Sequence, residues 1–600
     1  MNSPIKTNQL RLDIDYCVFN EQYDVFSVST SENYFKHGAR ILDVPLLDNR
    51  VCAIRFSGGK TFYAMMTHSP GNLNVLKTVL QQDKDADKIT ISQLNGEDLY
   101  SDVITQLLLN GMASAQSRFL RFNNLTGQLY CFHPQWLKHS KKNGQDVIMK
   151  VPCLKVNVTR QLRMEATVCT FTSVLLKNKI TFKRRRFEEY PQYILSVHNT
   201  LRRKLEQDTA TGYIQRQTDN DRADIPFIDF QSIARFEQSK MGVIWQVISD
   251  FNTKYDGLAR LNFEETSSYT ALDYDRSTSK EDKHAIRTAL SEASVRLVDV
   301  IGDEYSSMFC EKISELFSAR YGISVSIGKK VTKGHLNVRV IHNKDYYEGG
   351  HDPHDDEFDD AAVQHITLED FADNCETAIS TIVHELLIKQ DLQNGRISLF
   401  DWQALNYQND WSFGIASEGE PRRYYFMTVH SDGSFSIKEQ TLNLFEQSEY
   451  DDCVAIFEDE KRSSEQVRGI IRDGNGKINV IRDTGWYTIP QIEQIQEELS
   501  AGNTYLRGKA ARNEFLSACL GIKYIPNDDC GYYFVGTIGN GMRANIARAS
   551  NIRKIEGYSG APIFFEQLLP LMNVSFVRNG QLTILPFPFK YLREYVAWIK

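Results

Sequence analysis

The stretch "NCETAISTIVHELLIKQDLQNG", residues 374–395, carries the clearest fold signal in this 600-residue chain. Its apolar residues recur at helical spacing and Asn394-Gly395 ends the run, which predicts one helix. Two strand-like runs precede it, "ISVSI" (323–327) and "HLNVRVI" (335–341). Helices that alternate with strands predict a small α/β domain with a parallel sheet.

Further helices are expected before these strands. The segments "EDKHAIRTALSEASVRLVDVI" (281–301) and "EYSSMFCEKISELFSARYG" (304–322) both have i, i+3, i+4 apolar spacing. Gly322 is the expected C-cap of the second helix. The segment "SIARFEQSKMGVIWQVISDF" (232–251) predicts a helix that enters this domain.

After residue 396 the pattern changes to strands. "WSFGIAS" (411–417) is followed by "RRYYFMTVHSDGSFSIKEQ" (422–440), in which Ser431-Asp432-Gly433 predicts a hairpin turn. "KINVIRD" (477–483) then leads into the helical run "IPQIEQIQEEL" (489–499). Antiparallel strands followed by β–α units predict a mixed sheet of the RNase H type.

The N-terminal part divides into two further regions. Residues 1–120 alternate strand-like runs, such as "GARILDVPLL" (38–47), with an expected helix near "DLYSDVITQLLLNGM" (98–112). Residues 121–230 are strand-rich and then basic. The sequence therefore predicts an α/β multidomain protein with domains at 1–120, 121–230, 231–395 and 396–600.

Composition narrows the class of protein. Hydrophobic residues make up 42% of the chain and there are 33 Phe and 28 Tyr, enough for several folded cores. The net charge of −8 argues against a protein that is basic throughout. Ten cysteines without a C-x-x-C pair, no apolar signal segment and no membrane-length apolar run predict a soluble cytoplasmic protein.

Two basic segments stand out in this acidic chain. The first is "LLKNKITFKRRRFEEYPQYI" (175–194), in which positive charges are interleaved with Phe182 and Phe187. This pattern suits a nucleic-acid backbone and its bases, and the alternative is a strand edge protected by charge. The segment 536–555 has glycines before basic residues and no acid, so it suits a guide–target channel or a helix with a solvated basic face. The candidate backbone contacts are Lys183, Arg184, Arg185, Arg186, Arg202, Arg203, Arg543, Arg548 and Arg553.

Several apparent catalytic motifs are incomplete. "SGGKT" (57–61) lacks the first glycine of a phosphate loop, because position 54 is Ile, and "VHELLIK" (383–389) has Ile388 where a zincin needs its second histidine. In "SEYDDCVAIF" (448–457) the apolar run predicts a buried strand with Asp451 and Asp452 at its entry.

The segment "HDPHDDEFDDAAVQH" (351–365) gathers histidines and acids as a metal site would. Its neighbouring glycines, its proline and its lack of periodicity predict a loop, so a solvated acidic insertion is the alternative.

The order of elements from about 235 to 600 resembles the MID and PIWI domains of Argonaute proteins. "VQHIT" (363–367) is similar to the MID turn whose glutamine contacts the 5′-phosphate of a guide strand, which places Gln364 there. "LLIKQDLQNG" is similar to the helix whose lysine binds the same phosphate, which places Lys389 there. The alternative is a polar turn and a lysine that complements the helix dipole.

The resemblance also implies a degenerate slicing site. The first PIWI strand resembles "SFGIAS" with Ala416 at the first catalytic aspartate, and "INVIRD" places Asp483 at the second. The closing segment "LTILPFPFKYLREYVAWI" places Arg593 at the last metal ligand. Two-metal hydrolysis needs clustered carboxylates, so the resemblance implies no catalytic residue, no active-site metal and no slicing.

The resemblance implies a guide-dependent protein without its own chemistry. It would hold a short 5′-phosphorylated guide, DNA in preference to RNA, and recognise complementary DNA in prokaryotic defence, as Argonaute-like proteins of the DdmE type do against plasmids. A partner effector such as a helicase–nuclease is implied, together with a reduced or missing PAZ domain. Mg²⁺ at the guide 5′-phosphate is the one cofactor that the resemblance allows.

Two other functions remain open from the residues. An active metal-dependent nuclease would use the stretch 351–365 or the acids around Asp451 and Asp473. A protein with a basic channel would bind nucleic acid without a guide.

Overall fold

The computed structural model describes most of the chain. The described residues are 4–30, 39–81, 89–142, 145–179, 191–196, 200–215, 225–272, 283–347, 350–358, 361–371, 375–419, 421–441, 448–459, 465–503, 521–535, 550–574, 576 and 585–598. Together they form a mixed α/β multidomain chain, as the sequence predicts.

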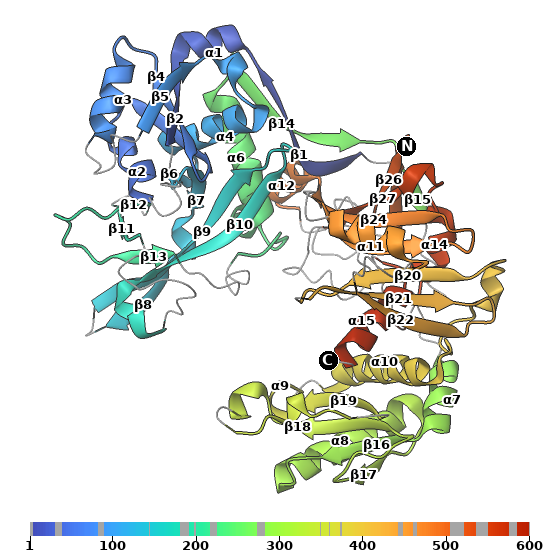
Figure 1. Ribbon diagram of the computed structural model, residues 1–600. Coiled ribbons are helices and arrows are strands. Elements are labelled where there is room, and N and C mark those ends of the chain that lie inside the picture. Colours follow the sequence, from blue (N-terminus) through green and yellow to red (C-terminus); the bar gives the residue numbers. More distant parts are fainter. Residues whose placement is uncertain are drawn as a thin grey trace. The chain divides into compact units, whose positions relative to one another are not determined.

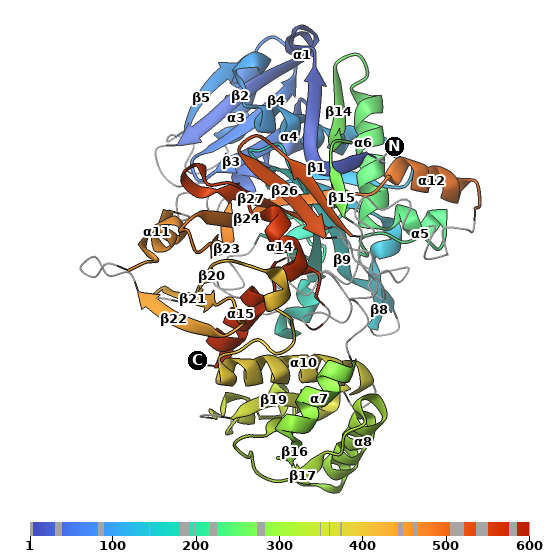
Figure 2. The same ribbon diagram turned by 90° about the vertical axis from the view of Figure 1, so that its right-hand side faces the viewer.

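The described residues divide into two compact units. The first holds those between 4 and 267 together with 486–503, and the second holds those between 268 and 485 together with 521–535 and 550–598. Figures 1 and 2 show the elements of each unit.

The first unit is built on two antiparallel sheets and a strand pair. One sheet has the order β3-β4-β2-β5, and the other has the order β12-β11-β13-β10-β9-β7-β6 with β8 beside β9. The elements are β1 (Ile5–Ile14), α1 (Tyr16–Gln22), β2 (Tyr23–Thr30), α2 (Ala39–Asp43), β3 (Val51–Gly58), β4 (Thr61–Thr67), α3 (Asn72–Leu80), β5 (Ile89–Leu94), α4 (Ser101–Gly111), β6 (Arg121–Leu125), β7 (Gln128–Phe132), β8 (Lys138–Lys142), β9 (Gln145–Val158), β10 (Met164–Ser173), β11 (Tyr193–Leu195), β12 (Leu201–Arg203), β13 (Tyr213–Gln215), α5 (Ile233–Glu237), α6 (Lys240–Lys254), β14 (Ala259–Thr266) and α12 (Ile492–Ser500).

The core of the first unit explains two departures from the predicted organisation. Leu107 of α4 shares a hydrophobic cluster with Phe236 of α5 and Phe251 of α6. The helices expected to open a new domain at residue 231 therefore belong to the first unit. "GARILDVPLL" is also no strand, since Ala39–Asp43 forms the short helix α2.

The second unit begins with a four-stranded parallel sheet of order β17-β16-β18-β19. Leu297 and Val338 on this sheet pack with Phe317 of α8 and Leu386 of α10, which lie along one face of the sheet (Figure 1). The elements are β15 (Thr270–Leu272), α7 (Lys283–Ala293), β16 (Val295–Asp299), α8 (Glu304–Tyr321), β17 (Ser326–Gly328), β18 (Leu336–Ile341), β19 (Ala362–Thr367), α9 (Leu368–Phe371) and α10 (Cys375–Asn394). The α/β domain with a parallel sheet is confirmed.

One expected helix in this region is wrong in its second half. The segment 281–301 contains α7 only to Ala293, and "VRLVD" then forms β16. Ser294 between them has a positive φ of 55°, which ends the helix. Burial of Val295, Leu297 and Val298 at the centre of a parallel sheet favours the strand over the helical spacing. Gly322, with φ of 66°, caps α8 as predicted.

The rest of the second unit forms a long sheet of order β15-β25-β26-β27-β24-β23-β20-β21-β22. Helices α14 and α15 pack on one face through Phe565 and Tyr591, and α11 packs on the other through Phe457 (Figure 2). The elements are β20 (Trp411–Ala416), β21 (Arg423–Val429), β22 (Phe435–Thr441), α11 (Asp451–Asp459), β23 (Gln466–Arg472), β24 (Ile478–Ile489), β25 (Ile522–Pro526), β26 (Cys530–Val535), β27 (Asn551–Gly557), α14 (Phe565–Met572) and α15 (Pro588–Trp598).

Three sequence predictions are revised by this sheet. Strand β23 is antiparallel to both β20 and β24, so the described strands of this region do not show the mixed sheet expected of an RNase H core. "DDCVAIF" is helix α11 and not a strand, with Val454 and Phe457 buried on one helical face. Of the basic segment 536–555, residues 551–555 belong to strand β27, while residues 536–549 lie outside the described residues. The hairpin turn is confirmed, with Gly433 at φ of 81°.

Candidate nucleic-acid interface

Gln364 and Lys389, the two candidate phosphate contacts, lie together. The Nζ atom of Lys389 donates to Oε1 of Gln364 at 2.9 Å and to the carbonyl of Val363 at 2.5 Å. Gln364 lies within strand β19, opposite Val338 of β18, and not in a turn as the resemblance implied. Alternation along β19 places Gln364 on the face that α10 covers, so the helix brings Lys389 to it.

The surroundings of Lys389 are mostly buried and contain charges of both signs. Burial is the main cause that lowers the pKa of Lys389, and the acids Glu594 and Glu385 oppose this shift. Lys590 of α15 bonds Glu594 at 2.5 Å and Glu385 at 3.4 Å. Lys389 therefore has a fixed place next to Gln364, with a charge network from α15 beside it.

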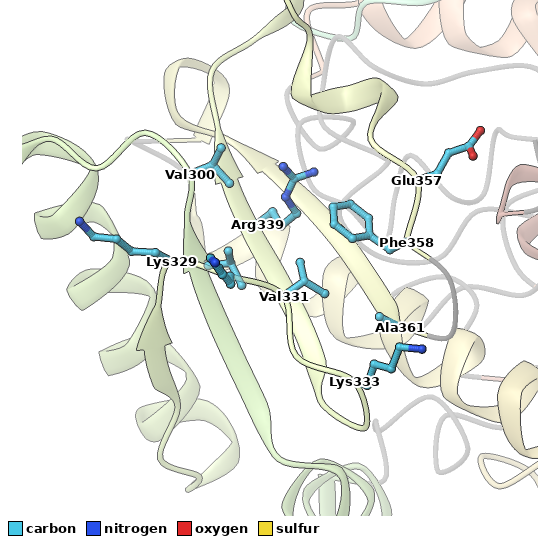
Figure 3. A pocket seen from close by; sticks show the side chains of 10 residues that line it. Val300, Lys329, Val331, Lys333, Arg339, Glu357, Phe358 and Ala361 are labelled. Carbon is cyan, nitrogen blue, oxygen red and sulfur yellow. The ribbon is translucent and has the colours of Figure 1, made fainter.

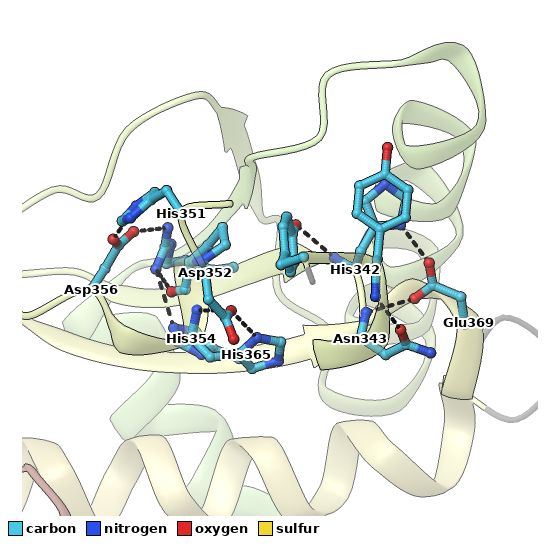
Figure 4. Close-up of polar contacts among 12 residues, drawn as sticks. His342, Asn343, His351, Asp352, His354, Asp356, His365 and Glu369 are labelled. Carbon is cyan, nitrogen blue, oxygen red and sulfur yellow. Dashed lines mark hydrogen bonds and ion pairs between the residues drawn. The ribbon is translucent and has the colours of Figure 1, made fainter. Parts of the chain in front are cut away.

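An aromatic group lies at the carboxyl end of β18. The ring of His342 stacks on Tyr346 with 3.6 Å between centroids, and the backbone N–H of His342 donates to the hydroxyl of Tyr347 at 3.1 Å. Glu369 accepts from the imidazole of His342 and from the backbone N–H of Asn343 (Figure 4). Tyr346 is 65% exposed, so its ring can receive a flat partner.

The acidic segment, residues 350–358, is held to the sheet by one arginine. Arg339 of β18 is 4% exposed and donates to Asp356 at 2.6 Å and to the carbonyl of Pro353 at 2.9 Å. His351 lies 2.8 Å from Asp356, and His354 bonds Asp352 at 2.6 Å (Figure 4). Two acids of this segment, Asp352 and Asp356, thus have histidine or arginine partners. Asp359 and Asp360 lie outside the described residues.

His365 next to this segment is neutral at physiological pH. Burial, assisted by the charge of Arg339, lowers the pKa of His365 to about 4. A neutral imidazole can accept a hydrogen bond, and Nη1 of Arg339 lies 3.3 Å from its Nε2. Within the residues that the structure describes, no three His, Cys, Asp or Glu side chains are grouped as metal ligands. Both interpretations of the acidic segment, an insertion and a metal site, stay predictions.

A basic cavity that the sequence analysis missed lies on the face of the parallel sheet opposite α8 and α10. It has a volume of about 460 Å³ and is shown in Figure 3. Arg339 and Phe358 line it, with the guanidinium 4.6 Å from the ring centroid. Lys329, Lys330 and Lys333 line it from the loop after β17. The run "GKKVTKG" (328–334) was the available signal for it.

Two of the three positions that the resemblance aligned with metal ligands line a second cavity, and the third, Asp483, pairs with an arginine of its lining. Ala416 at the end of β20 and Arg593 of α15 both line it, and Arg468 of β23 lines it as well. Asp483 of β24 accepts from Arg468 at 2.8 Å and from Arg553 of β27 at 2.6 Å. Residues that are far apart in the chain therefore converge at this point.

This arrangement does not suit divalent cations. Asp483 is committed to two guanidinium groups, and Arg593 adds a further positive charge. A guanidinium cannot lose its proton in a protein, so this charge persists at all relevant pH values. Two metal ions need several free carboxylates in one place.

The remaining candidate backbone contacts are only partly placed. Arg202 is engaged with Asp208 through two bonds of 2.7 and 2.9 Å, and Arg203 lies over the ring of Tyr193 at 5.8 Å. Arg553 is 8% exposed and bound to Asp483, so it faces no channel. These internal partners argue against a backbone role for the three arginines. Lys183, Arg184, Arg185, Arg186, Arg543 and Arg548 lie outside the described residues.

Comparison of the chain with protein-family models and with curated proteins gives no match. Among the helices that the structure describes, none combines the length and the apolar character that crossing a membrane requires. The site geometry is thus the only ground for a functional proposal beside the resemblance.

Proposed function

We propose that this protein recognises nucleic acid through a short guide strand that it holds by its 5′-phosphate, and that it does not cut the target. The observation that carries the proposal is the convergence of Ala416, Arg593 and the Asp483–Arg468 pair on one cavity. The resemblance aligned Ala416, Asp483 and Arg593 with one site; Ala416 and Arg593 line the cavity, and Asp483 pairs with Arg468, which lines it as well.

The guide phosphate would bind at Gln364 and Lys389. The ammonium group of Lys389 has three donors, of which two are directed at Gln364 and Val363. The third can donate to a phosphate oxygen, and burial strengthens this interaction by excluding water. The exposed ring of Tyr346 offers a stacking surface for a base. Mg²⁺ at the phosphate stays a prediction.

The remaining parts of the proposal rest on the resemblance. They are a DNA guide, a complementary DNA target, a role in prokaryotic defence against plasmids or other invading DNA, a cytoplasmic location and a partner effector such as a helicase–nuclease. A protein with the arginine arrangement around Asp483 would need such a partner, because target recognition alone does not remove the invading DNA.

The first experiment extracts nucleic acid from the purified protein and determines its length, sugar and 5′ end. A discrete population of short 5′-phosphorylated strands is expected. A broad range of lengths would instead favour the protein that binds without a guide. Incubation with a guide, its complementary target and Mn²⁺ should leave the target intact, and guide-directed cleavage lost in Asp483→Ala would establish the nuclease alternative.

A second experiment tests the phosphate contacts. Binding of a 5′-phosphorylated DNA oligonucleotide is compared with binding of its 5′-hydroxyl form, in the wild type and in the double variant Gln364→Ala, Lys389→Ala. The wild type should prefer the phosphorylated strand and the double variant should lose that preference. The control is Lys438→Ala, which removes an exposed lysine of β22 that pairs with Glu449. An unchanged preference in the double variant rejects the assignment.

A further inference from the structure

Two buried cysteines lie directly opposite each other on neighbouring strands of the first unit. Strands β9 and β10 are antiparallel and lie side by side (Figure 1), and their register pairs Cys153 with Cys169. The exposed fractions of the two residues are 0% and 7%. Both side chains belong to one hydrophobic cluster, which also contains Tyr130 and Phe171. Both cysteines are thiols in this structure.

The placement of the two cysteines suits a disulfide. Residues that face each other in an antiparallel pair have Cα atoms about 4.5–5.5 Å apart, and a disulfide requires about 4.4–6.8 Å. The Sγ atom of Cys153 lies 3.5 Å from the carbonyl oxygen of Cys169, so this thiol is turned toward β10. The register between Met164 and Thr172 has no shift. A bond between the two sulfur atoms therefore requires little movement of either strand.

The surroundings distinguish the two thiols. Nε2 of Gln215 on β13 donates to Sγ of Cys169 at 3.6 Å, and a donor at the sulfur favours the thiolate, which is the reactive form. Among the described strands, β10 pairs on the side away from β9 only with β13, at residues 171–173. Cys169 lies just before this pairing begins, whereas Cys153 is fully buried. Cys169 is therefore the thiol that an oxidant reaches first.

We propose that Cys153 and Cys169 form a reversible redox switch, in which hydrogen peroxide converts the two thiols into a disulfide between β9 and β10. The thiolate of Cys169 attacks one peroxide oxygen, the O–O bond breaks, and the departing hydroxide takes up the thiol proton as water. Cys169 is then a sulfenic acid. The sulfur of Cys153 attacks the sulfur of Cys169, the S–O bond breaks, and the hydroxide leaves with the proton of Cys153 as a second water. A dithiol reductant reverses the oxidation by thiol–disulfide exchange.

The disulfide would restrain the sheet that contains both strands. It closes the hairpin between residues 153 and 169, and a closed loop removes conformations from the unfolded chain. Leu154 and Val156 on the other face of β9 pack in the core that α4 and α6 share, so the restraint acts next to this core. The oxidised protein should unfold at a temperature about 5 °C higher than the reduced protein. This switch goes beyond the proposed function and does not depend on a guide.

The test is peptide mapping of the full-length wild type before and after exposure to hydrogen peroxide. The remaining thiols are blocked with iodoacetamide in urea, and the protein is digested with trypsin, which cuts after lysine and arginine. The expected product is the peptide of residues 151–155 joined to that of residues 164–177, with two hydrogens fewer than the separate peptides. Dithiothreitol should release both peptides. Differential scanning calorimetry should show Tm rise with the joined product and return after reduction.

Cysteine variants serve as matched controls. Cys169→Ala should abolish the joined peptide and the rise in Tm, and Cys153→Ala replaces it if that variant does not fold. Cys131→Ala removes a buried cysteine of β7 that lies opposite Leu154 and packs in the core shared with α4 and α6, so the joined peptide should remain. The exposed Cys17 shows in each sample that the peroxide has reacted.

Three results would overturn the inference. The first is a sample in which Cys17 is oxidised while Cys153 and Cys169 are recovered as separate alkylated peptides. The second is a joined peptide that links one of these two cysteines to a different partner. The third is a joined peptide without a change in Tm, which would show that the bond does not restrain the sheet.

Discussion

The acidic segment and the region around Asp483, beside the cavity lined by Ala416 and Arg593, both combine aspartate with arginine, but in opposite proportions. In the acidic segment one buried arginine, Arg339, organises several acids and histidines around it. At the cavity one aspartate, Asp483, is shared by Arg468 and Arg553 while further arginines line the wall. The first region uses an arginine to fix a chain segment, and the second uses one aspartate to hold two arginines.

The difference teaches that the partners of each carboxylate matter more for a metal site than the number of carboxylates in a stretch of sequence. A carboxylate can ligate a cation only if another cation has not already taken its oxygens. Asp356 and Asp483 are both engaged by guanidinium groups at 2.6 Å. What separates the two aspartates is the second partner, which is His351 for Asp356 and a second arginine for Asp483. The following predictions test how much each pairing contributes.

Removal of Arg339 should have the largest effect. Arg339→Leu removes the guanidinium that donates to Asp356 and to the carbonyl of Pro353, and breaking a buried ion pair typically costs about 3–5 kcal/mol. We expect a loss of about 3 kcal/mol in the free energy of unfolding, measured with urea. Arg296→Leu on β16, where the side chain donates to the carbonyl of Lys330, should cost about 1 kcal/mol. Equal effects of the two variants would mean that the acidic segment contributes nothing.

Asp483→Asn should have a smaller effect. The substitution removes the charge that compensates buried Arg553, whose pKa burial already lowers. Asp483 is partly exposed, so we expect a loss of about 2 kcal/mol in the free energy of unfolding. In Asp410→Asn, an exposed partner of His430, the loss should stay below about 0.5 kcal/mol. A more stable Asp483→Asn would show that the pair is strained.

Asp391 is a buried carboxylate without an arginine, and it sharpens the contrast. Burial raises the pKa of Asp391 to about 6, while hydroxyl donors from Ser398 and Tyr591 oppose the shift. The folded protein therefore binds more protons at this group than the unfolded chain between about pH 4 and pH 6. Stability from this group is present below about pH 4 and is lost as the pH rises through about 6.

The corresponding test is Tyr591→Phe, which removes a hydrogen bond of 2.6 Å to Asp391. A bond to an ionised group contributes about 1.5–3 kcal/mol and a neutral one about 1 kcal/mol. We expect a loss near 2 kcal/mol at pH 7.5 and near 1 kcal/mol at pH 5, by urea unfolding at both values. The control is Tyr595→Phe, one helical turn after Tyr591. The ring of Tyr595 packs on Tyr425, and its substitution should show no such pH dependence. The same loss at both pH values would place the ionisation of Asp391 elsewhere.

Divalent cations should have the smallest effect on stability. A specific site at 100 times its Kd would add about 2.7 kcal/mol to the folded state. Because arginines occupy Asp356 and Asp483, we expect Mg²⁺, Mn²⁺ or EDTA to move Tm by no more than about 1 °C. Differential scanning calorimetry of the guide-free protein provides the measurement. A rise of several degrees that Asp356→Asn removes would restore the metal interpretation of the acidic segment.

Much of the fold could be predicted from local patterns. The helices α8 and α10 and the hairpin of β21 and β22 have their periodicity and their stop signals in the sequence, and they form as expected. The errors share a cause. "VRLVD" continues a helical pattern, but it forms a strand because it is buried in the centre of the parallel sheet. "DDCVAIF" has the apolar run of a strand, but it forms a helix that is buried on one face.

The candidate site was predictable only in part. Gln364 and Lys389 were chosen from motifs, and in the fold the Nζ atom of Lys389 lies 2.9 Å from Oε1 of Gln364. The basic cavity beside Arg339 was missed, because its lysines and its arginine come from separate segments. The arginines at 202, 203 and 553 were chosen as backbone contacts from charge density, which carries no information on internal partners.

The sequence by itself determined which residue types are present and those element ends that carry a local stop signal, such as Gly322 after α8 and the turn at Gly433, because these signals depend on neighbours along the chain. It also determined that Ala416 and Arg593 cannot ligate a metal ion. Only the tertiary structure decided that these two positions share a cavity with Arg468 and that Asp483 is held by Arg468 and Arg553. Electrostatic pairing acts over a few ångströms in space, and the partners here are separated by 15 and 70 residues in the chain.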